Sequence, residues 1–337
     1  IIIFVMHINS TLPKKILAWY DNSKRILPWR VGKKSPKKVY YRLLSEFMLQ
    51  QTQVKTVIPY FKLFTKKFRS LESLSKAREE KVLKLWEGLG YYRRARNLLA
   101  TSKILVKEYR SKLPKDIETI KTLPGIGDYT SNVLIALIYN KPTLAFDGNV
   151  KRIISRILNL DEKKIDYENF KNLNRKYIFN TTRNSDLVEA MMEFGALICN
   201  PKSPKCIVCP IKKNCKFFKS PRKIKKTKKI TIKKNINIFC YLNKNGEIAL
   251  TQKNDFGFLN SFNLPQIESA KNKKSLRSWK LLSKYKNSIS NKKLNINLYY
   301  KFSENIPMDY TWHSIKTNNG FMPTFTKKIF KQVSVLF

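Results

Sequence analysis

The chain has 337 residues, of which 42% are hydrophobic and 12% aromatic, which excludes an intrinsically disordered protein and fits two domains. The formal net charge of +45, from 68 basic and 23 acidic residues, favours a polyanionic partner such as nucleic acid. An A/T-rich coding sequence, which enriches Lys, Asn and Ile, can also supply much of this excess.

Two features bear on the compartment. No apolar run is long enough to span a membrane, and residues 1–6 are too short and lack the basic region of a signal peptide. We therefore expect a cytoplasmic protein with no membrane partner. Four of the five cysteines fall within 17 residues, which favours a metal or cluster site over a disulfide framework.

Residues from about Leu12 to Leu197 are predicted to form a run of helices. Apolar residues recur there at spacings of three and four, as in Leu43, Leu44, Phe47 and Met48, and Pro or Gly residues separate the segments. Because no strand pattern interrupts the run, the first domain is expected to be all-α.

An acidic residue, Glu46, lies within the early helical segment Ser45-Glu46-Phe47-Met48-Leu49-Gln50-Gln51. By pattern alone it is an exposed helical residue. A second, Asp147, directly precedes a predicted helix from Val150 to Leu158, where an N-cap is the ordinary role. Spacing along the sequence does not show whether the two carboxyl groups meet.

Two glycine-containing turns lie between these carboxylates. Gly88-Leu89-Gly90-Tyr91-Tyr92 is followed by several arginines, a composition that suits insertion into a base stack and contacts with phosphates, or equally a helix start with a solvated basic face. Leu123-Pro124-Gly125-Ile126-Gly127 precedes a predicted helix from Tyr129 to Tyr139. Such a turn lets backbone N–H groups approach a phosphate at a helix N-terminus, although most are simple connections.

The cysteines have the spacing Cys199-x6-Cys206-x2-Cys209-x5-Cys215. One compact loop that supplies four thiolates suits a [4Fe–4S] cube, whereas zinc sites usually have two pairs separated by a longer loop. Structural zinc and buried thiols are the alternatives.

The chain changes character after the cysteines. Residues 216–235 are a basic stretch that is interpreted as a linker and could equally touch phosphates. From Ile236 the sequence predicts a hairpin with its turn at residues 243–246, and residues 294–302 predict a further strand. The predicted domains are therefore residues 1–215, all-α with the cysteine loop, and residues 236–337, α+β.

Taken together, these motifs resemble the MutY-type adenine DNA glycosylases of the helix-hairpin-helix superfamily that also holds endonuclease III. The resemblance is close through residue 215 and loose afterwards. It is carried by residues 45–54, by Gly88-Leu89-Gly90-Tyr91-Tyr92 and by the cysteine spacing. It implies a mainly α helix-hairpin-helix glycosylase domain with a [4Fe–4S] loop, followed by a C-terminal Nudix-like domain.

The resemblance also implies roles for individual residues. Glu46 matches the general acid and Asp147 the carboxylate that stabilises the sugar cation. Gln51 and Tyr91 match residues that wedge into the duplex beside the odd guanine, and Arg30 and Glu189 match contacts with the flipped adenine. Tyr129 and Asn149 match residues that line the pocket, and Gly125 and Gly127 match the hairpin that grips DNA. The ligands of the cluster match Cys199, Cys206, Cys209 and Cys215.

The implied activity is base excision repair: hydrolysis that removes adenine paired with 8-oxoguanine or guanine in duplex DNA, by a monomer in the bacterial nucleoid. Relatives that also cut the strand carry a Lys nucleophile where this chain has Tyr129, so little strand cleavage is expected. In the family, a Phe-Ser-His loop touches the oxidised base, and it matches Ile289-Ser290-Asn291 here. The serine is present as Ser290, but the aromatic residue and the histidine of that loop are absent.

Two other readings stay open from the sequence. One is an endonuclease III-like glycosylase for oxidised pyrimidines, against which Tyr129 and the second domain argue. The other is a catalytically silent iron–sulfur protein that binds DNA, against which the presence of both Glu46 and Asp147 argues.

Overall fold

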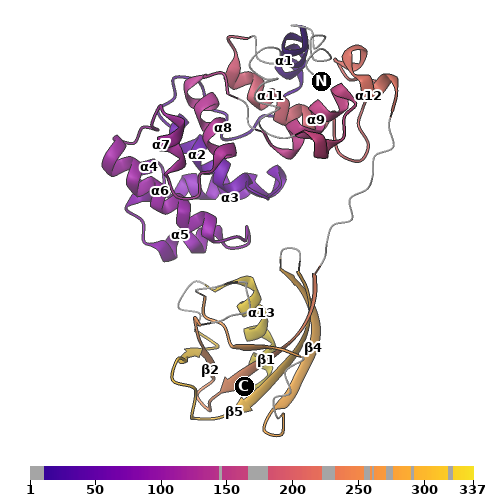
Figure 1. Cartoon of the computed structure of the whole chain (residues 1–337). Coiled ribbons are helices and arrows are strands. Elements are labelled where there is room, and N and C mark those ends of the chain that lie inside the picture. Colours follow the sequence, from indigo (N-terminus) through magenta and orange to yellow (C-terminus); the bar gives the residue numbers. More distant parts are fainter. Residues whose placement is uncertain are drawn as a thin grey trace. The chain divides into compact units, whose positions relative to one another are not determined.

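The structure of the chain is a computed structural model that divides into two compact units, Ile1–Ile224 and Lys225–Phe337 (Figure 1). It describes residues 11–143, 146–165, 181–221, 232–253, 259, 262–270, 276–289, 292–317 and 322–337. The basic stretch 216–235 contains a short helix at its start and the first residues of a strand at its end.

Helices and connecting turns, with no strand, make up the described residues of the first unit, as the sequence predicts. Its helices are α1 (Thr11–Ser23), α2 (Lys38–Leu49), α3 (Val54–Lys67), α4 (Leu71–Ser75), α5 (Glu79–Trp86), α6 (Arg93–Tyr109), α7 (Ile117–Lys121), α8 (Asp128–Tyr139), α9 (Gly148–Leu158), α11 (Asn184–Leu197) and α12 (Lys216–Lys219), with 3-10 turns η2 (Glu162–Lys164) and η4 (Lys212–Asn214).

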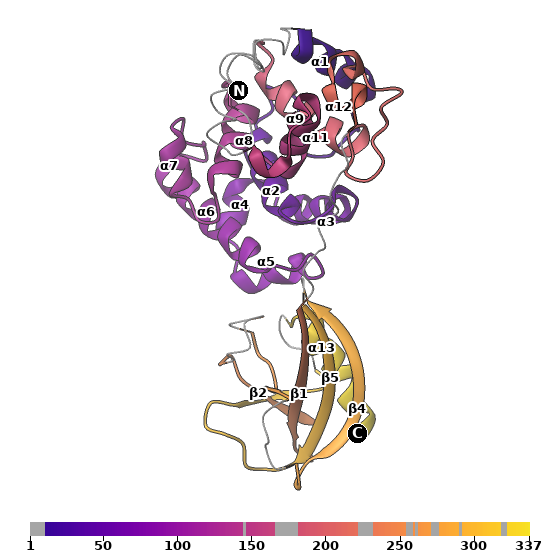
Figure 2. The same ribbon diagram turned by 45° about the vertical axis from the view of Figure 1, so that its right-hand side comes forward.

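Two groups of helices build this unit. In one, α2, α3, α5 and α6 pack together around large side chains such as Phe47, Phe64 and Trp86, which are all fully buried. In the other, α1, α8, α9 and α11 share a second apolar cluster. Burial of each large side chain stabilises the fold by about 2 kcal/mol. Helix α2 contacts α8, so the two groups meet along these helices (Figure 2).

The second unit is a six-stranded sheet with a helix against one face. Its elements are β1 (Ile232–Leu242), β2 (Glu247–Leu250), β3 (Gln266–Ser269), β4 (Lys280–Ile289), β5 (Lys292–Phe302), β6 (Thr311–Ser314), α13 (Thr324–Val333) and the 3-10 turn η5 (Ser334–Leu336). The strand order is β4-β5-β1-β2-β6, and β3 also pairs with β1.

The predicted hairpin and strand of the second unit are confirmed. Strands β1 and β2 pair antiparallel with Leu242 opposite Ile248, and β5 covers the predicted residues. Strand β5 runs parallel to β1, and alternate residues of both strands join Phe325 and Ile329 of α13 in the core. Ser290, predicted to touch an oxidised base, lies outside the described residues, between β4 and β5.

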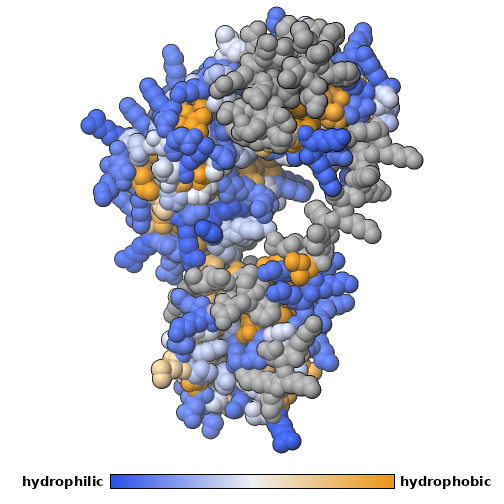
Figure 3. All heavy atoms as spheres, in the orientation of Figure 1, coloured by the Kyte–Doolittle hydropathy of each residue, from blue (hydrophilic) through white to orange (hydrophobic). Residues whose placement is uncertain are grey.

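Hydrophilic side chains cover most of the drawn face of each unit (Figure 3). Among the described residues, no helix combines the length and the apolar character that crossing a membrane requires.

Candidate functional site

Glu46 is buried, with 7% of its surface exposed, so the reading of an exposed helical residue is wrong. Almost every residue from Tyr40 to Met48 is buried, because α2 is apolar on most sides and lies between the two helix groups. Burial raises the pKa of Glu46 to about 7; the charge of Arg42 opposes this rise, and the charges of Glu189 and Asp147 add to it.

Asp147 is the N-cap residue of α9, as its position before the predicted helix suggests. Its Oδ1 accepts from the backbone N–H of Val150 at 2.7 Å, and its Oδ2 accepts from Nδ2 of Asn149 at 2.7 Å. Both oxygens therefore accept hydrogen bonds, which fix the orientation of the side chain.

Tyr129, in the first turn of α8, lies within electrostatic range of both carboxyl groups. Burial raises its pKa above the ordinary value, and the charges of Glu46 and Asp147 raise it further. The tyrosine hydroxyl therefore stays protonated at neutral pH. The fold thus gathers side chains from α2, α8 and the start of α9 that are far apart in sequence.

Asn149 is fixed between Asp147 and the helix α11. Its Oδ1 accepts from Nη2 of Arg152 at 2.8 Å, while its Nδ2 donates to Oδ2 of Asp147. A Cβ atom at Gly195 would come within 2.7 Å of the Asn149 Cβ, so only glycine fits there without a shift. Asn149 therefore holds the Asp147 carboxylate in place.

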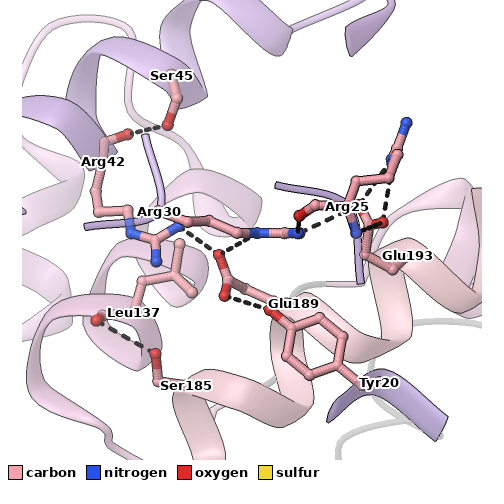
Figure 4. A network of polar contacts seen from close by, with 9 residues as sticks. All are labelled: Tyr20, Arg25, Arg30, Arg42, Ser45, Leu137, Ser185, Glu189 and Glu193. Atoms are coloured by element: carbon pink, nitrogen blue, oxygen red, sulfur yellow. Dashed lines mark hydrogen bonds and ion pairs between the residues drawn. The ribbon is translucent and has the colours of Figure 1, made fainter. Parts of the chain in front are cut away.

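Glu189, on α11, stands at the centre of a polar network (Figure 4). Its Oε1 accepts from Nε of Arg30 at 3.0 Å and from Nη1 of Arg42, and its Oε2 accepts from the hydroxyl of Tyr20 at 2.7 Å. Burial opposes its ionisation, but Arg42 and Arg30 outweigh burial and hold the pKa of Glu189 below its ordinary value. Arg30 and Glu189, predicted to contact one ligand, are brought together as an ion pair.

Sequence reasoning missed Arg42, Tyr20 and Glu193 as parts of this site. Arg42 is buried at 5% exposure, and Glu193 accepts from both Arg25 and Arg30. A usable signal existed for Arg42. A charged residue between apolar neighbours on a buried helix needs a partner, and an acidic residue follows four positions later.

The turn between α7 and α8 approaches α2 closely. Gly125 has φ +79°, and a Cβ atom there would lie 2.6 Å from Asn97 Nδ2 and 2.8 Å from Phe47 Cε1. Gly127 is the N-cap of α8, and no side chain caps the N–H groups of that helix. A helix start with uncapped N–H groups can accept an anion such as a phosphate.

Gln51 and Tyr91, predicted to enter a base stack, are both exposed and both have left-handed backbones, with φ of 56° and 49°. This conformation is unusual for residues other than glycine and is found preferentially at functional sites. Tyr91 is 46% exposed. Arg94, one of the nearby arginines whose composition suggested phosphate contacts, instead points inward and donates to backbone carbonyl groups.

The four cysteines Cys199, Cys206, Cys209 and Cys215 are all half-buried, carry no disulfide and line a single pocket. Its remaining wall is largely apolar and includes Ile153, Ile157, Phe194 and Phe217. Burial is the main cause that raises the pKa of Cys209 to about 11, and the charges of the other three cysteines contribute to the rise.

The pocket fits a sulfur-ligated cluster. Nη1 of Arg156 donates to Cys199 Sγ at 3.4 Å and to the Asn200 carbonyl at 2.7 Å, so a cation stands beside the thiols. The described side chains are not already arranged as a set of three or more metal ligands. The donors, their spacing and the neighbouring guanidinium nevertheless match what a cluster with a negative charge requires.

Comparison with known sequences gives consistent relatives. The family model described as "HhH-GPD superfamily base excision DNA repair protein" matches residues 44–178. Adenine DNA glycosylases of two Buchnera aphidicola subspecies, Baizongia pistaciae and Schizaphis graminum, are each 35% identical. They cover 84% and 92% of this chain, which in turn covers 83% and 88% of them. The Homo sapiens adenine DNA glycosylase is 35% identical over 60% of this chain and 38% of its own length.

Solved structures share the fold of the helical unit. A thermostable thymine-DNA glycosylase has a TM-score of 0.54 at 24% identity, over 62% of this chain and 95% of that chain. An endonuclease III from a non-covalent complex with DNA has a TM-score of 0.51 at 20% identity, over 61% of this chain and 93% of that chain. The predicted endonuclease III-like fold is therefore confirmed.

Proposed function

The chain belongs to the adenine DNA glycosylases, and on this premise we propose that it removes adenine paired with 8-oxoguanine or guanine from duplex DNA by hydrolysis of the N-glycosidic bond. The observation that carries the proposal is one buried carboxyl group with a pKa near 7 within electrostatic range of a second carboxylate fixed by hydrogen bonds. Base excision by two carboxyl groups needs these two environments.

Glu46 acts as the general acid. Adenine leaves poorly until a ring nitrogen is protonated, because the departing base would otherwise carry away a negative charge. A carboxyl group whose pKa lies near the operating pH can hold a proton and still give it up. Desolvation of Glu46 on α2 supplies that pKa, and the opposing charge of Arg42 keeps it from rising further.

Asp147 stabilises the sugar cation that forms as the bond breaks. The transition state has oxocarbenium character, as in other glycoside hydrolysis, and an ionised carboxylate close to it lowers its energy. The hydrogen bonds from Val150 and Asn149 fix the orientation of this carboxylate before substrate arrives. We propose that Asn149 and Tyr129 line the adenine pocket beside these carboxyl groups.

Tyr129 limits the reaction to base removal. A Schiff base with the sugar requires an amine, and a protonated phenol beside two carboxyl groups cannot form one. The enzyme is therefore monofunctional, and the product is an abasic site in an uncut strand.

Recognition of the flipped adenine falls to Arg30 and Glu189. The carboxylate of Glu189 can accept a hydrogen bond from the exocyclic amino group of adenine. The three side chains that donate to this carboxylate fix its rotamer. The donors come from α1, α2 and the loop between them, so the pocket is assembled from segments distant in sequence.

Duplex DNA is held by two further features. The backbone N–H groups after Gly125 and Gly127, at the start of α8, meet a phosphate, which positions the duplex without reading bases. Gln51 and Tyr91 enter the stack beside the guanine and help to keep the adenine outside the helix.

A [4Fe–4S] cluster would be held by Cys199, Cys206, Cys209 and Cys215. When bound, it supplies a rigid covalent tie for the loop 199–215. Arg156 would neutralise part of its charge, and it fixes the loop backbone by donating to the carbonyl groups of Asn200 and Pro201.

Residues 236–337 form a Nudix-like domain for lesion recognition, joined through the basic stretch 216–235 to the catalytic residues 1–215. The domain has no cluster of Glu residues of the kind that pyrophosphate hydrolysis needs. Ser290 contacts the oxidised guanine from the connection between β4 and β5. We propose that the enzyme works as a monomer.

The test is a single-turnover assay on duplexes that contain A·8-oxoguanine, A·G or A·T pairs. Adenine release from the first two, without strand cleavage and without adducts trapped by borohydride, is the expected result. Release that survives unchanged in Glu46→Gln would contradict the mechanism, and release of an oxidised pyrimidine instead would favour an endonuclease III-like specificity.

A further inference from the structure

Arg94, in the first turn of α6, is buried at 7% exposure and donates to five backbone carbonyl groups. The acceptors are the carbonyl oxygens of Phe47 (3.1 Å), Met48 (2.8 Å), Gln50 (2.5 Å), Leu89 (3.1 Å) and Gly90 (3.1 Å). These carbonyls belong to two segments, the C-terminal end of α2 and the turn before α6. A single guanidinium therefore ties together segments that are about 40 residues apart in sequence.

Each of the two segments leads directly into an exposed residue with a left-handed backbone. Gln50 precedes Gln51, and Gly90 precedes Tyr91. Such a backbone persists in residues other than glycine only when the surrounding structure holds it. The carbonyl groups that immediately precede both residues are the ones that Arg94 holds.

The guanidinium also lies against the aromatic side chains of this region. Its Cζ is 5.5 Å from the centre of the Tyr91 ring and 5.4 Å from that of Trp86. The indole N–H of Trp86 donates to the Gly90 carbonyl at 3.2 Å, which supports the turn from its other side.

Within the part of the chain that the structure describes, Arg94 forms no ion pair, and its charged group donates to backbone carbonyls instead. Its acceptors at the end of α2 carry the negative end of the helix dipole. Burial lowers the pKa of Arg94 to about 10, which leaves the group charged at neutral pH.

We propose that Arg94 is a positioning residue that fixes the spacing of Gln51 and Tyr91, so that both side chains enter the duplex as one unit. The inference rests on the proposed function of those two residues. The planar guanidinium directs the N–H groups of Nη1 to the end of α2 and those of Nη2 to the turn before α6, while its Nε–H is buried without a partner among the described residues. An ammonium group is a compact charge with three donors. Lysine at this position keeps the charge and loses the bridge.

The test compares Arg94→Lys with the wild-type chain. Fluorescence of a 2-aminopurine placed next to the guanine reports unstacking of the duplex, and single-turnover adenine release reports catalysis. We expect Arg94→Lys to lose most of the fluorescence rise and to slow release by about 10- to 100-fold. Arg183→Lys, at an arginine paired with Asp21 and Asp186 on the surface, is the matched control and should keep both signals.

A double-mutant cycle measures the coupling between Gln51 and Tyr91, which would not change if Arg94 only stabilised the fold. With Arg94 present, the combined loss in Gln51→Ala/Tyr91→Ala should be smaller than the product of the single losses, because the two side chains act together. In the Arg94→Lys background the two losses should become independent and multiply.

The outcomes separate the two hypotheses. If Gln51→Ala and Tyr91→Ala leave the fluorescence rise intact, the proposed entry of these residues is wrong and the inference about Arg94 fails with it. If they reduce it while Arg94→Lys behaves like Arg183→Lys, only the inference about Arg94 is overturned. Should Arg94→Lys not fold, Trp86→Phe removes the donor to Gly90 and shortens the ring that packs on the guanidinium, and an unchanged fluorescence rise would then overturn the inference.

Discussion

Arg42 and Glu46 lie one helical turn apart on α2, and the charge of Arg42 lowers a pKa that burial raises. The result, a pKa of about 7, lies near the pH at which a repair enzyme works. Arg42 also donates to Glu189, so one buried cation links the proposed acid to the proposed adenine contact.

The first prediction concerns the pH dependence of adenine release. Because Glu46 must be protonated, the wild-type rate should fall as the pH rises through about 7. Arg42→Met removes a cation that favours the carboxylate, so the pKa of Glu46 should rise and the falling limb should move to higher pH. Single-turnover rates across the neutral range measure this shift. Lys38→Met, on the same helix, is the control, and a limb that moves to lower pH would contradict the assignment.

A second prediction concerns stability. The folded pKa of Glu46, about 7, exceeds the unfolded value of about 4.3, so the wild-type chain loses stability as the pH rises between these values. Glu46→Gln removes this penalty. The variant should therefore be more stable than the wild type by about 1–3 kcal/mol above pH 7 and show little difference near pH 4. Thermal melting at both pH values measures it, and a variant that is less stable at high pH would refute the desolvated state of Glu46.

The third prediction separates the cap role of Asp147 from its proposed role in catalysis. Asn caps a helix about as well as Asp, so Asp147→Asn should keep the cap and lose only the hydrogen bond from Asn149, while adenine release slows by about 100-fold or more. Asp147→Ala should lose the rate and also about 1 kcal/mol of stability. Equal rates of adenine release in Asp147→Asn and the wild type would show that Asp147 acts only as a helix cap.

The two glycines of the turn before α8 provide a fourth prediction. Gly125→Ala combines a left-handed backbone with contacts below 3 Å to Asn97 and Phe47, so it should destabilise the fold by at least about 1 kcal/mol. Gly127→Ala meets no atom within 4 Å and has an extended backbone, so it should cost less. Denaturant unfolding of both variants measures the difference, and equal losses would contradict the close packing against α2.

A fifth prediction tests the cluster. Cys209→Ser should lose the brown colour and visible absorbance of the purified protein and release the loop 199–215, seen as faster proteolysis there. Cys240→Ser is the matched control, because Cys240 is fully buried in β1 and belongs to the other unit. Visible absorbance that persists in Cys209→Ser and disappears in Cys240→Ser would overturn the ligand assignment.

Local chemistry in the sequence determined much of the architecture. Apolar residues at spacings of three and four predicted α2, α8 and α9, because a helix must bury one face whatever it packs against. The turn at residues 243–246 fixed the β1–β2 hairpin, since loop length sets the register of adjacent strands. Strand β4 was not predicted: its alternate residues are only half-buried, so its apolar pattern is weak.

The tertiary structure alone decided the chemistry of the site. The amino-acid pattern around Glu46 indicated an exposed residue, and only the packing of α2 against both helix groups removes the carboxyl group from water and raises its pKa. Tyr20 and Glu189 are 169 positions apart, and Arg94 binds carbonyls at the end of a helix that precedes it by more than 40 residues. Such contacts depend on how helices pack, which no local periodicity encodes, because desolvation and charge pairing are properties of neighbours in space.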